Sequence, residues 1–412
     1  MKNKLKGEIN MISKILGDVK SPFTDELIQD LIEKYITCGC DDDLFYKVVN
    51  KLENATKTTN PHIDELMNQI YSQGIDEREL WCYPDKENIQ LIFSKYGGWV
   101  ELSSEDAQIK NNQRTSDNKR PLLYRIYLNI KGKQKAEFIE DYIKRFQKSK
   151  IPFKLKFSTD DSRLDQIVIL SRSENFEENV LAVEELTKEI QLGDLPMLIG
   201  KYKNGIGIVE DYYSTSPTEV RLALVRSSVK KYLCDHIDEF ESQLSEKEKK
   251  KINKYISSFN NLYESNKEEI EKLGEKYKDI SKTHYQVKST IDCAKEHIEN
   301  DNMAHIFRKG MLLDLGNAIK QIYSNNPEQF ICEVSQNYRM IGTQVWGFSQ
   351  DFVFSNETER TFLNSKENEI LLSSEKIGSQ LGEISRKGLT DSVQADLISM
   401  VVEKDKSKEI EQ

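Results

Sequence analysis

The hydrophobic pattern changes its period along the middle of the chain. From residue 122 to residue 130, polar and apolar side chains alternate. This period of two predicts a strand with Arg125, Tyr127 and Asn129 on one face and aliphatic residues on the other. Apolar residues then recur at helical spacing from 138 to 146. The chain is therefore expected to pass from a strand into an amphipathic helix.

Two further strands are predicted after this helix. The alternation over 153–157 places Lys154 and Lys156 on a common face, and 167–170 is a run of aliphatic residues typical of a buried strand. Strands mixed with helices predict an α+β domain that spans 76–235. Its other predicted elements are short strands near 80–100, a helix over 174–191, a strand over 205–209 that begins at a glycine, and a helix from Pro217 to Tyr232.

Helical patterns flank this domain on both sides. Residues 1–75 form a predicted N-terminal helical region, and 236–355 forms a strongly charged helical extension with imperfect, coiled-coil-like heptads. The tail, 356–412, is expected to be helical or partly disordered because it is rich in charged residues. The predicted fold class is therefore α+β, with a small mixed or antiparallel sheet and packed helices between two helical regions.

The composition of the chain argues against several classes of protein. The 412 residues include 59 Lys and Arg against 69 Asp and Glu, a net charge of −10 that argues against nonspecific binding of nucleic acid. No apolar stretch is long enough for a membrane span, and the charged N-terminus lacks the apolar region of a signal peptide. The six cysteines are scattered, as reduced thiols are. We expect a cytoplasmic protein, or an effector that is secreted without a cleaved signal peptide.

Basic residues on the predicted strands and helices of the middle domain are the main chemical signal. If these side chains converge on one sheet, they repel one another unless an anion lies between them, and a phosphate group suits this role. Crowding by other cations and burial also lower the pKa of a lysine, so that its neutral amine becomes a base. The alternative is that each side chain faces solvent separately. The residues concerned are Arg125, Lys154, Lys156, Arg163 and Arg221.

Four segments of the middle domain, taken in order, resemble the HopA effector family. The resemblance covers roughly 76–235 and depends on the order and spacing of short motifs. The segments are Tyr124-Arg125-Ile126-Tyr127-Leu128-Asn129, Pro152-Phe153-Lys154-Leu155-Lys156, Arg163-Leu164-Asp165, and Gly205-Ile206-Gly207-Ile208-Val209-Glu210-Asp211 followed by the helix that carries Arg221.

This family includes type III effectors of plant pathogens and lyase-like proteins of peptide-maturation pathways, and it is remotely similar to the phosphothreonine lyases. The resemblance implies β-elimination of phosphate from phosphoserine or phosphothreonine in a peptide or protein, which leaves a dehydroamino acid and needs no metal or organic cofactor. The implied roles are Lys156 as the base, with Lys154 as the second choice; Arg125, Arg163 and Arg221 as phosphate ligands; Tyr127 as the acid; Asp165 as the salt-bridge partner that orients a cation; and Asn129 as a supporting residue.

The chain departs from the lyases at one position. The lyases carry a histidine as the general acid where this sequence has Tyr127. The alternative function is therefore a non-catalytic effector or phosphopeptide-binding protein that works through its helical regions. The candidate partners are a kinase that phosphorylates the substrate, a secretion chaperone, and a second copy of the chain bound through the C-terminal helices.

Other chemistries have less support in the sequence. Cys293, His297 and His305 lie at helical spacings, but no further ligand pattern accompanies them, so no metal site is predicted. The segment Gly205-Ile206-Gly207 lacks the third glycine of a dinucleotide-binding loop. Trp99 is expected to be a core residue.

Overall fold

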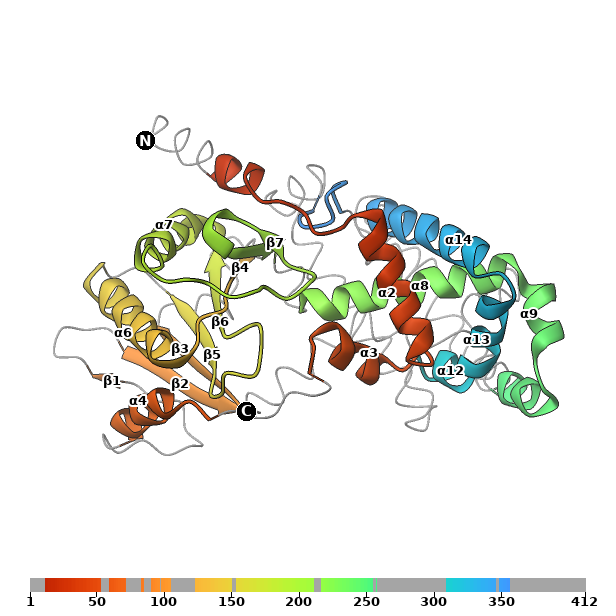
Figure 1. The fold of residues 1–412 in the computed structure, drawn as a ribbon, viewed down its shortest axis with the longest axis horizontal. Helices are drawn as coiled ribbons and strands as arrows, with labels where there is room; N and C mark the ends of the chain where they lie inside the picture. Colours follow the sequence, from red (N-terminus) through yellow and green to blue (C-terminus); the bar gives the residue numbers. More distant parts are fainter. Residues whose placement is uncertain are drawn as a thin grey trace, which may run out of the picture. The chain divides into compact units, whose positions relative to one another are not determined.

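The computed structural model describes residues 12–52, 59–71, 83–84, 90–96, 98–104, 123–149, 153–210, 216–254, 257, 309–345 and 348–355. The chain divides into two compact units, each built from two separate stretches of sequence. Figure 1 shows their helices and strands. The first unit is Met1–Phe23 with Lys47–Thr218, and the second is Thr24–Tyr46 with Glu219–Gln412.

The first unit contains the sheet. Its described part has eight strands in the order β1-β2-β3-β5-β6-β4-β8-β7, and every neighbouring pair is antiparallel. The sheet is therefore antiparallel rather than mixed. The strands are β1 (Tyr83–Pro84), β2 (Gln90–Tyr96), β3 (Trp99–Ser104), β4 (Leu123–Leu128), β5 (Lys154–Ser158), β6 (Ile167–Arg172), β7 (Gly200–Lys201) and β8 (Gly207–Glu210).

Helices α6 (Gly132–Ser149) and α7 (Phe176–Leu186) pack on the apolar face of the sheet (Figure 1). The fully buried ring of Tyr142 lies edge-on to Phe153, with ring centroids 5.8 Å apart. Burying rings of this size contributes much of the core's stability. Helix α4 (Pro61–Tyr71) packs in turn against α6.

The second unit is helical in its described part. A buried ion pair joins two of its helices, with Arg226 Nη1 2.6 Å from Asp42 Oδ2. The tyrosine hydroxyl of Tyr35 also donates to Asp42. The helices are α2 (Asp25–Thr37), α3 (Asp42–Val49), α8 (Pro217–Asp235), α9 (Ile237–Gln243), α12 (Lys309–Asp314), α13 (Gly316–Asn325) and α14 (Pro327–Met340), and α3 and α8 cross the boundary between the units.

The structure confirms the α+β class and revises several boundaries. The predicted N-terminal helical region 1–75 is divided, because residues 24–46 belong to the second unit. The predicted strand over 205–209 begins only at Gly207, since Asn204 and Gly205 have positive φ in a tight turn. The predicted helix 174–191 ends at Leu186.

Two other predictions lie wholly or largely outside the described residues. These are the tail 356–412 and the coiled-coil-like stripe that starts near residue 252. Within the parts of the chain that the structure describes, none of the helices combines the length and apolar character that crossing a membrane requires.

Candidate functional site

The sheet face opposite α6 and α7 carries several cations, and we call it the cationic face. Residues directly opposite each other in an antiparallel pair point to the same side. Leu170 of β6 lies opposite Arg125 of β4 on one side and opposite Lys154 of β5 on the other. Both cations therefore lie on this face. Two residues further along the strands, Val168 lies opposite both Tyr127 and Lys156, so these three residues form the next row across the sheet. The basic side chains of β4 and β5 therefore lie on one face of the sheet.

Lys156 lies at the centre of this cluster. Its Nζ is 4.3 Å from the centroid of the largely buried Trp99 ring, on the neighbouring strand β3. Burial is the main cause that lowers the pKa of Lys156 to about 8, and the positive charge of Arg125 lowers it further. Glu101 and Asp165 act in the opposite direction. A substantial fraction of this amine is therefore neutral near physiological pH.

Arg163 reaches the same aromatic ring from the loop between β5 and β6. Its Cζ is 4.7 Å from the Trp99 centroid, which is a cation–π distance. Asp165 binds its guanidinium through two hydrogen bonds, from Nε at 2.9 Å and from Nη2 at 3.2 Å. Asp165 is therefore the ion-pair partner of Arg163. A planar guanidinium held in this way suits recognition of a phosphate group.

Lys154 differs from Lys156 in its contacts. Its Nζ lies 2.8 Å from Glu101 Oε1, and both side chains are mostly buried. This ion pair engages the Nζ group of Lys154. The structure therefore favours Lys156 over Lys154 as a base.

A buried network fixes the loop that carries Arg163. The ammonium group of Lys135, which is fully buried at the start of α6, donates to Asp160 O at 3.0 Å and to Gln166 Oε1 at 2.5 Å. Gln166 in turn donates to the carbonyl oxygen of Arg163 at 2.6 Å. Asp161 accepts from the side chain of Asn60 and lies 3.4 Å from Lys135 Nζ. This network links the helical layer to the backbone of the site.

Tyr127 is largely buried on β4, opposite Gly207 of β8. A Cβ atom at Gly207 would lie 2.7 Å from Ile199 Cγ2 and 2.9 Å from Tyr127 Cβ, which is closer than packing permits. Glycine at this position therefore lets β8 approach the Tyr127 side chain. The structure places Tyr127 in the same register row as Lys156, and its role as an acid stays a prediction.

Asn129 and Arg221 have contacts of a different kind. The Asn129 side chain donates to Asp194 O at 2.7 Å, which fixes a loop beyond the end of β4. Arg221 belongs to the second unit, where its guanidinium donates to the carbonyl oxygen of Phe352 and lies 4.0 Å from the Phe348 ring centroid. The predicted role of Arg221 in phosphate binding stays a prediction.

Two residues of the cationic face carry no functional signal in the sequence. Trp99 was expected only as a core residue, and it is buried, but its ring also contacts two cations. Glu101 was not singled out, although it pairs with Lys154. In the sequence, both follow Gly97-Gly98 on a segment whose apolar residues show no clear helical or strand spacing. Only the strand order shows that β3, which carries them, adjoins β5.

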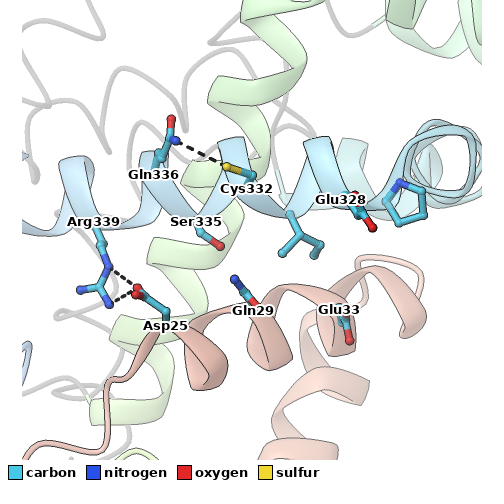
Figure 2. Close-up of a pocket in the computed structure, with 10 residues that line it drawn as sticks. Asp25, Gln29, Glu33, Glu328, Cys332, Ser335, Gln336 and Arg339 are labelled. Carbon is cyan, nitrogen blue, oxygen red and sulfur yellow. Dashed lines mark hydrogen bonds and ion pairs between the residues drawn. The ribbon is translucent and has the colours of Figure 1, made fainter.

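The second unit has a groove between α2 and α14 with a volume of about 470 Å³ (Figure 2). Of the residues that line it, Arg339 is the one cation, and it is bound to Asp25 at 2.6 Å. The groove also contains carboxylates, so it does not suit a phosphate group. Its lining residues are Asp25, Gln29, Glu33, Pro327, Glu328, Ile331, Cys332, Ser335, Gln336 and Arg339.

The described residues contain no group of three or more His, Cys, Asp or Glu side chains that could hold a metal ion. The histidines and the cysteine weighed as metal ligands, Cys293, His297 and His305, lie outside those residues. Among the described cysteines, Cys38, Cys40, Cys234 and Cys332 are not joined in disulfide bonds.

Comparison with known proteins gives one similar structure. No protein-family model matches the chain, and no curated protein matches it. Among solved structures, the chain is similar to the effector protein from Pseudomonas syringae pv. syringae strain 61, with 12% sequence identity and a TM-score of 0.33. The similarity covers 48% of this chain and 84% of that chain.

Proposed function

We propose that the first unit is a phosphoserine or phosphothreonine lyase, which removes phosphate from a phosphorylated peptide or protein by β-elimination. One observation carries this proposal: the amine of Lys156 and the guanidinium of Arg163 contact the same Trp99 ring, on the sheet face that also holds Arg125. The proposed base and the proposed phosphate ligands would then share one face of the sheet.

The reaction needs one proton transfer and one bond cleavage. Neutral Lys156 Nζ takes the proton from Cα of the phosphorylated residue, and the electron pair left at Cα forms the Cα=Cβ double bond. The Cβ–O bond breaks, and phosphate leaves with the electrons of that bond. The products are a dehydroamino acid and inorganic phosphate, and the lysine later returns its proton to solvent.

The lowered pKa of Lys156 supports its assignment as the base. A lysine with the ordinary pKa of about 10.4 is almost fully protonated at neutral pH. With a pKa of about 8, a far larger share of Lys156 is neutral. A general base works best when its pKa lies near the operating pH.

The arginines supply the electrostatic part of the proposal. Arg125 and Arg163 bind the phosphate and stabilise both the negative charge that develops at Cα and the departing phosphate dianion. Tyr127 donates a proton to the leaving oxygen, in place of the histidine of the lyases.

The test uses the full chain and a phosphoserine peptide, followed by mass spectrometry. The proposal predicts a product that has lost the mass of phosphoric acid and that then adds a thiol across its new double bond. Hydrolysis would give a serine peptide that does not react with thiols, and this result would contradict elimination. An unchanged peptide that stays bound would instead support the alternative, a phosphopeptide-binding effector. A kinase that phosphorylates the natural substrate is the expected partner.

A further inference from the structure

The groove between α2 and α14 belongs to the second unit, whereas the cationic face belongs to the first. The two helices run in opposite directions (Figure 2). Asp25 at the start of α2 pairs with Arg339 near the end of α14, and Glu33 and Glu328 lie toward the other end. On α2 the lining residues Asp25, Gln29 and Glu33 are four apart, so they form one stripe about 12 Å long.

The charges that line the groove are unbalanced. Arg339 is the one cation among the described lining residues, and Asp25 already pairs with it at 2.6 Å. Glu33 and Glu328 are exposed, and neither carboxylate has an ion-pair partner in the described part of the chain. Carboxylates that share one end of a groove repel each other, and a bound cation relieves this repulsion. This end of the groove therefore favours a basic ligand.

The floor of the groove offers apolar contact and one unused polar atom. Ile331 on α14 is 7% exposed. Four residues further on, the Oγ atom of Ser335 is shielded from solvent and has no hydrogen-bond partner among the described residues. A lysine or arginine side chain has an apolar stem and a charged end, so it can lie on Ile331 while its charge reaches a carboxylate. The lining therefore suits a ligand that is both apolar and basic.

An amphipathic helix is the occupant that fits this groove. Two packed helices leave a groove along their axes, and a third helix laid in it makes contact through side chains three and four residues apart. A stripe of about 12 Å matches about two turns of such a helix. A second copy of the chain is disfavoured as the occupant, since its net charge of −10 would add negative charge.

We propose that the groove between α2 and α14 docks a basic amphipathic helix of a partner protein. Lysine or arginine side chains of that helix lie against Glu33 and Glu328, and its apolar stripe packs on Ile331. One of its polar side chains forms a hydrogen bond with the hydroxyl group of Ser335. The helical unit thereby binds a protein partner, whether or not the first unit catalyses elimination.

The first experiment measures binding of fluorescent helical peptides to the full chain by anisotropy. The peptides are about 18 residues long, which is enough to form a helix, and they share one leucine stripe. Their other positions carry Lys, Gln or Glu. We expect the Lys peptide to bind about tenfold more tightly than the Gln peptide, and the Glu peptide to bind most weakly. Equal affinities for the three peptides would overturn the proposal.

Variants then test whether the groove causes this preference. Glu33→Gln combined with Glu328→Gln should weaken binding of the Lys peptide about tenfold, and Glu33→Lys combined with Glu328→Lys should make the Glu peptide the tighter ligand. The matched control is Glu241→Gln combined with Glu246→Gln. These two exposed glutamates lie outside the lining, so the control changes the net charge equally and should keep the wild-type affinity. With folding of each variant checked by thermal unfolding, an affinity for the Lys peptide that survives loss of both groove carboxylates would overturn the proposal.

Cys332 reports directly on occupancy of the groove, because it is exposed and lines it. The bound Lys peptide should slow alkylation of Cys332 by iodoacetamide, followed by peptide mass mapping, while alkylation of Cys234 on α8 should not change. Unslowed alkylation of Cys332 would place the bound peptide elsewhere and overturn the proposal. A dimer of the full chain that protects Cys332 without any peptide would assign the groove to a second copy, which also overturns it.

Discussion

Glu101 and Lys156 lie directly opposite each other on strands β3 and β5, yet the carboxylate of Glu101 forms its ion pair with Lys154, at 2.8 Å. The negative charge of Glu101 raises the pKa of Lys156, against the larger effects of burial and Arg125. Glu101 therefore has two effects on the site. It forms the ion pair with Lys154, and it limits how far the pKa of Lys156 falls.

The first prediction concerns the pH dependence of elimination. Lys156 is inactive when protonated, so the rate should rise with pH through about 8, the pKa of this amine. Glu101→Gln removes a charge that raises this pKa, so the rising limb should shift to lower pH. The measurement is the rate of phosphate release from a phosphopeptide between pH 6 and pH 10. Glu137→Gln, which removes an exposed carboxylate from α6, should leave the limb in place. A shift to higher pH in Glu101→Gln would show that the assignment of the base is wrong.

The second prediction tests the hydroxyl group of Tyr127. Tyr127→Phe removes the proposed acid while keeping the buried ring on β4. General acid catalysis typically contributes 10²–10⁴-fold, so we expect the rate of elimination to fall about 100-fold. Steady-state kinetics should place this loss in kcat rather than in KM. An unchanged kcat would mean that phosphate leaves without help from Tyr127.

The third prediction concerns folding stability and Lys135. Burial is the main cause that lowers the pKa of Lys135 to about 8 in the folded protein, below its ordinary value of 10.5. The unfolded chain therefore binds more protons between these two values, and the contribution of Lys135 to stability rises as pH rises from about 8 toward 10.5. Below about pH 8 the amine is charged in both states, and this contribution is smallest. Lys135→Met should thus be more destabilising at pH 10 than at pH 7.5. Urea unfolding at both pH values gives the comparison, and equal losses would contradict the shifted pKa.

The fourth prediction concerns the ion pair of the second unit. Asp42→Asn leaves the buried guanidinium of Arg226 without its charged partner, which typically costs about 3–5 kcal/mol. Asp235→Asn breaks the exposed pair with Lys231 on α8 and should cost less than about 0.5 kcal/mol. Denaturant unfolding of the two variants measures both values. Similar losses would show that burial of the Arg226 pair has little effect on stability.

Local sequence patterns predicted the strands and the faces on which their basic residues lie, but not which strands are neighbours in the sheet. The period of two over 122–130 and 153–157 was sufficient to place Arg125, Lys154 and Lys156 on strand faces, because the side-chain direction of a strand alternates with every residue. Strand order depends on long-range packing, so nothing near Trp99 in the sequence indicates that β3 adjoins β5.

The division of the chain into two units also could not be predicted from local sequence patterns. Helix α2 packs against α14, and Asp25 forms an ion pair with Arg339 across most of the chain length. Periodicity describes the apolar stripe of each helix but not the partner on which that stripe packs. For this reason a boundary was expected near residue 75, whereas the chain leaves the first unit at Phe23 and returns to it at Lys47.

The most direct test of the account is the rate of phosphate elimination in Lys156→Ala, measured with a phosphoserine peptide. The control is Lys144→Ala, which removes an exposed lysine from α6, and thermal unfolding should show that both variants are folded. The account predicts that Lys156→Ala forms no dehydroalanine while Lys144→Ala retains the wild-type rate. A folded Lys156→Ala protein that still forms dehydroalanine at the wild-type rate would contradict it.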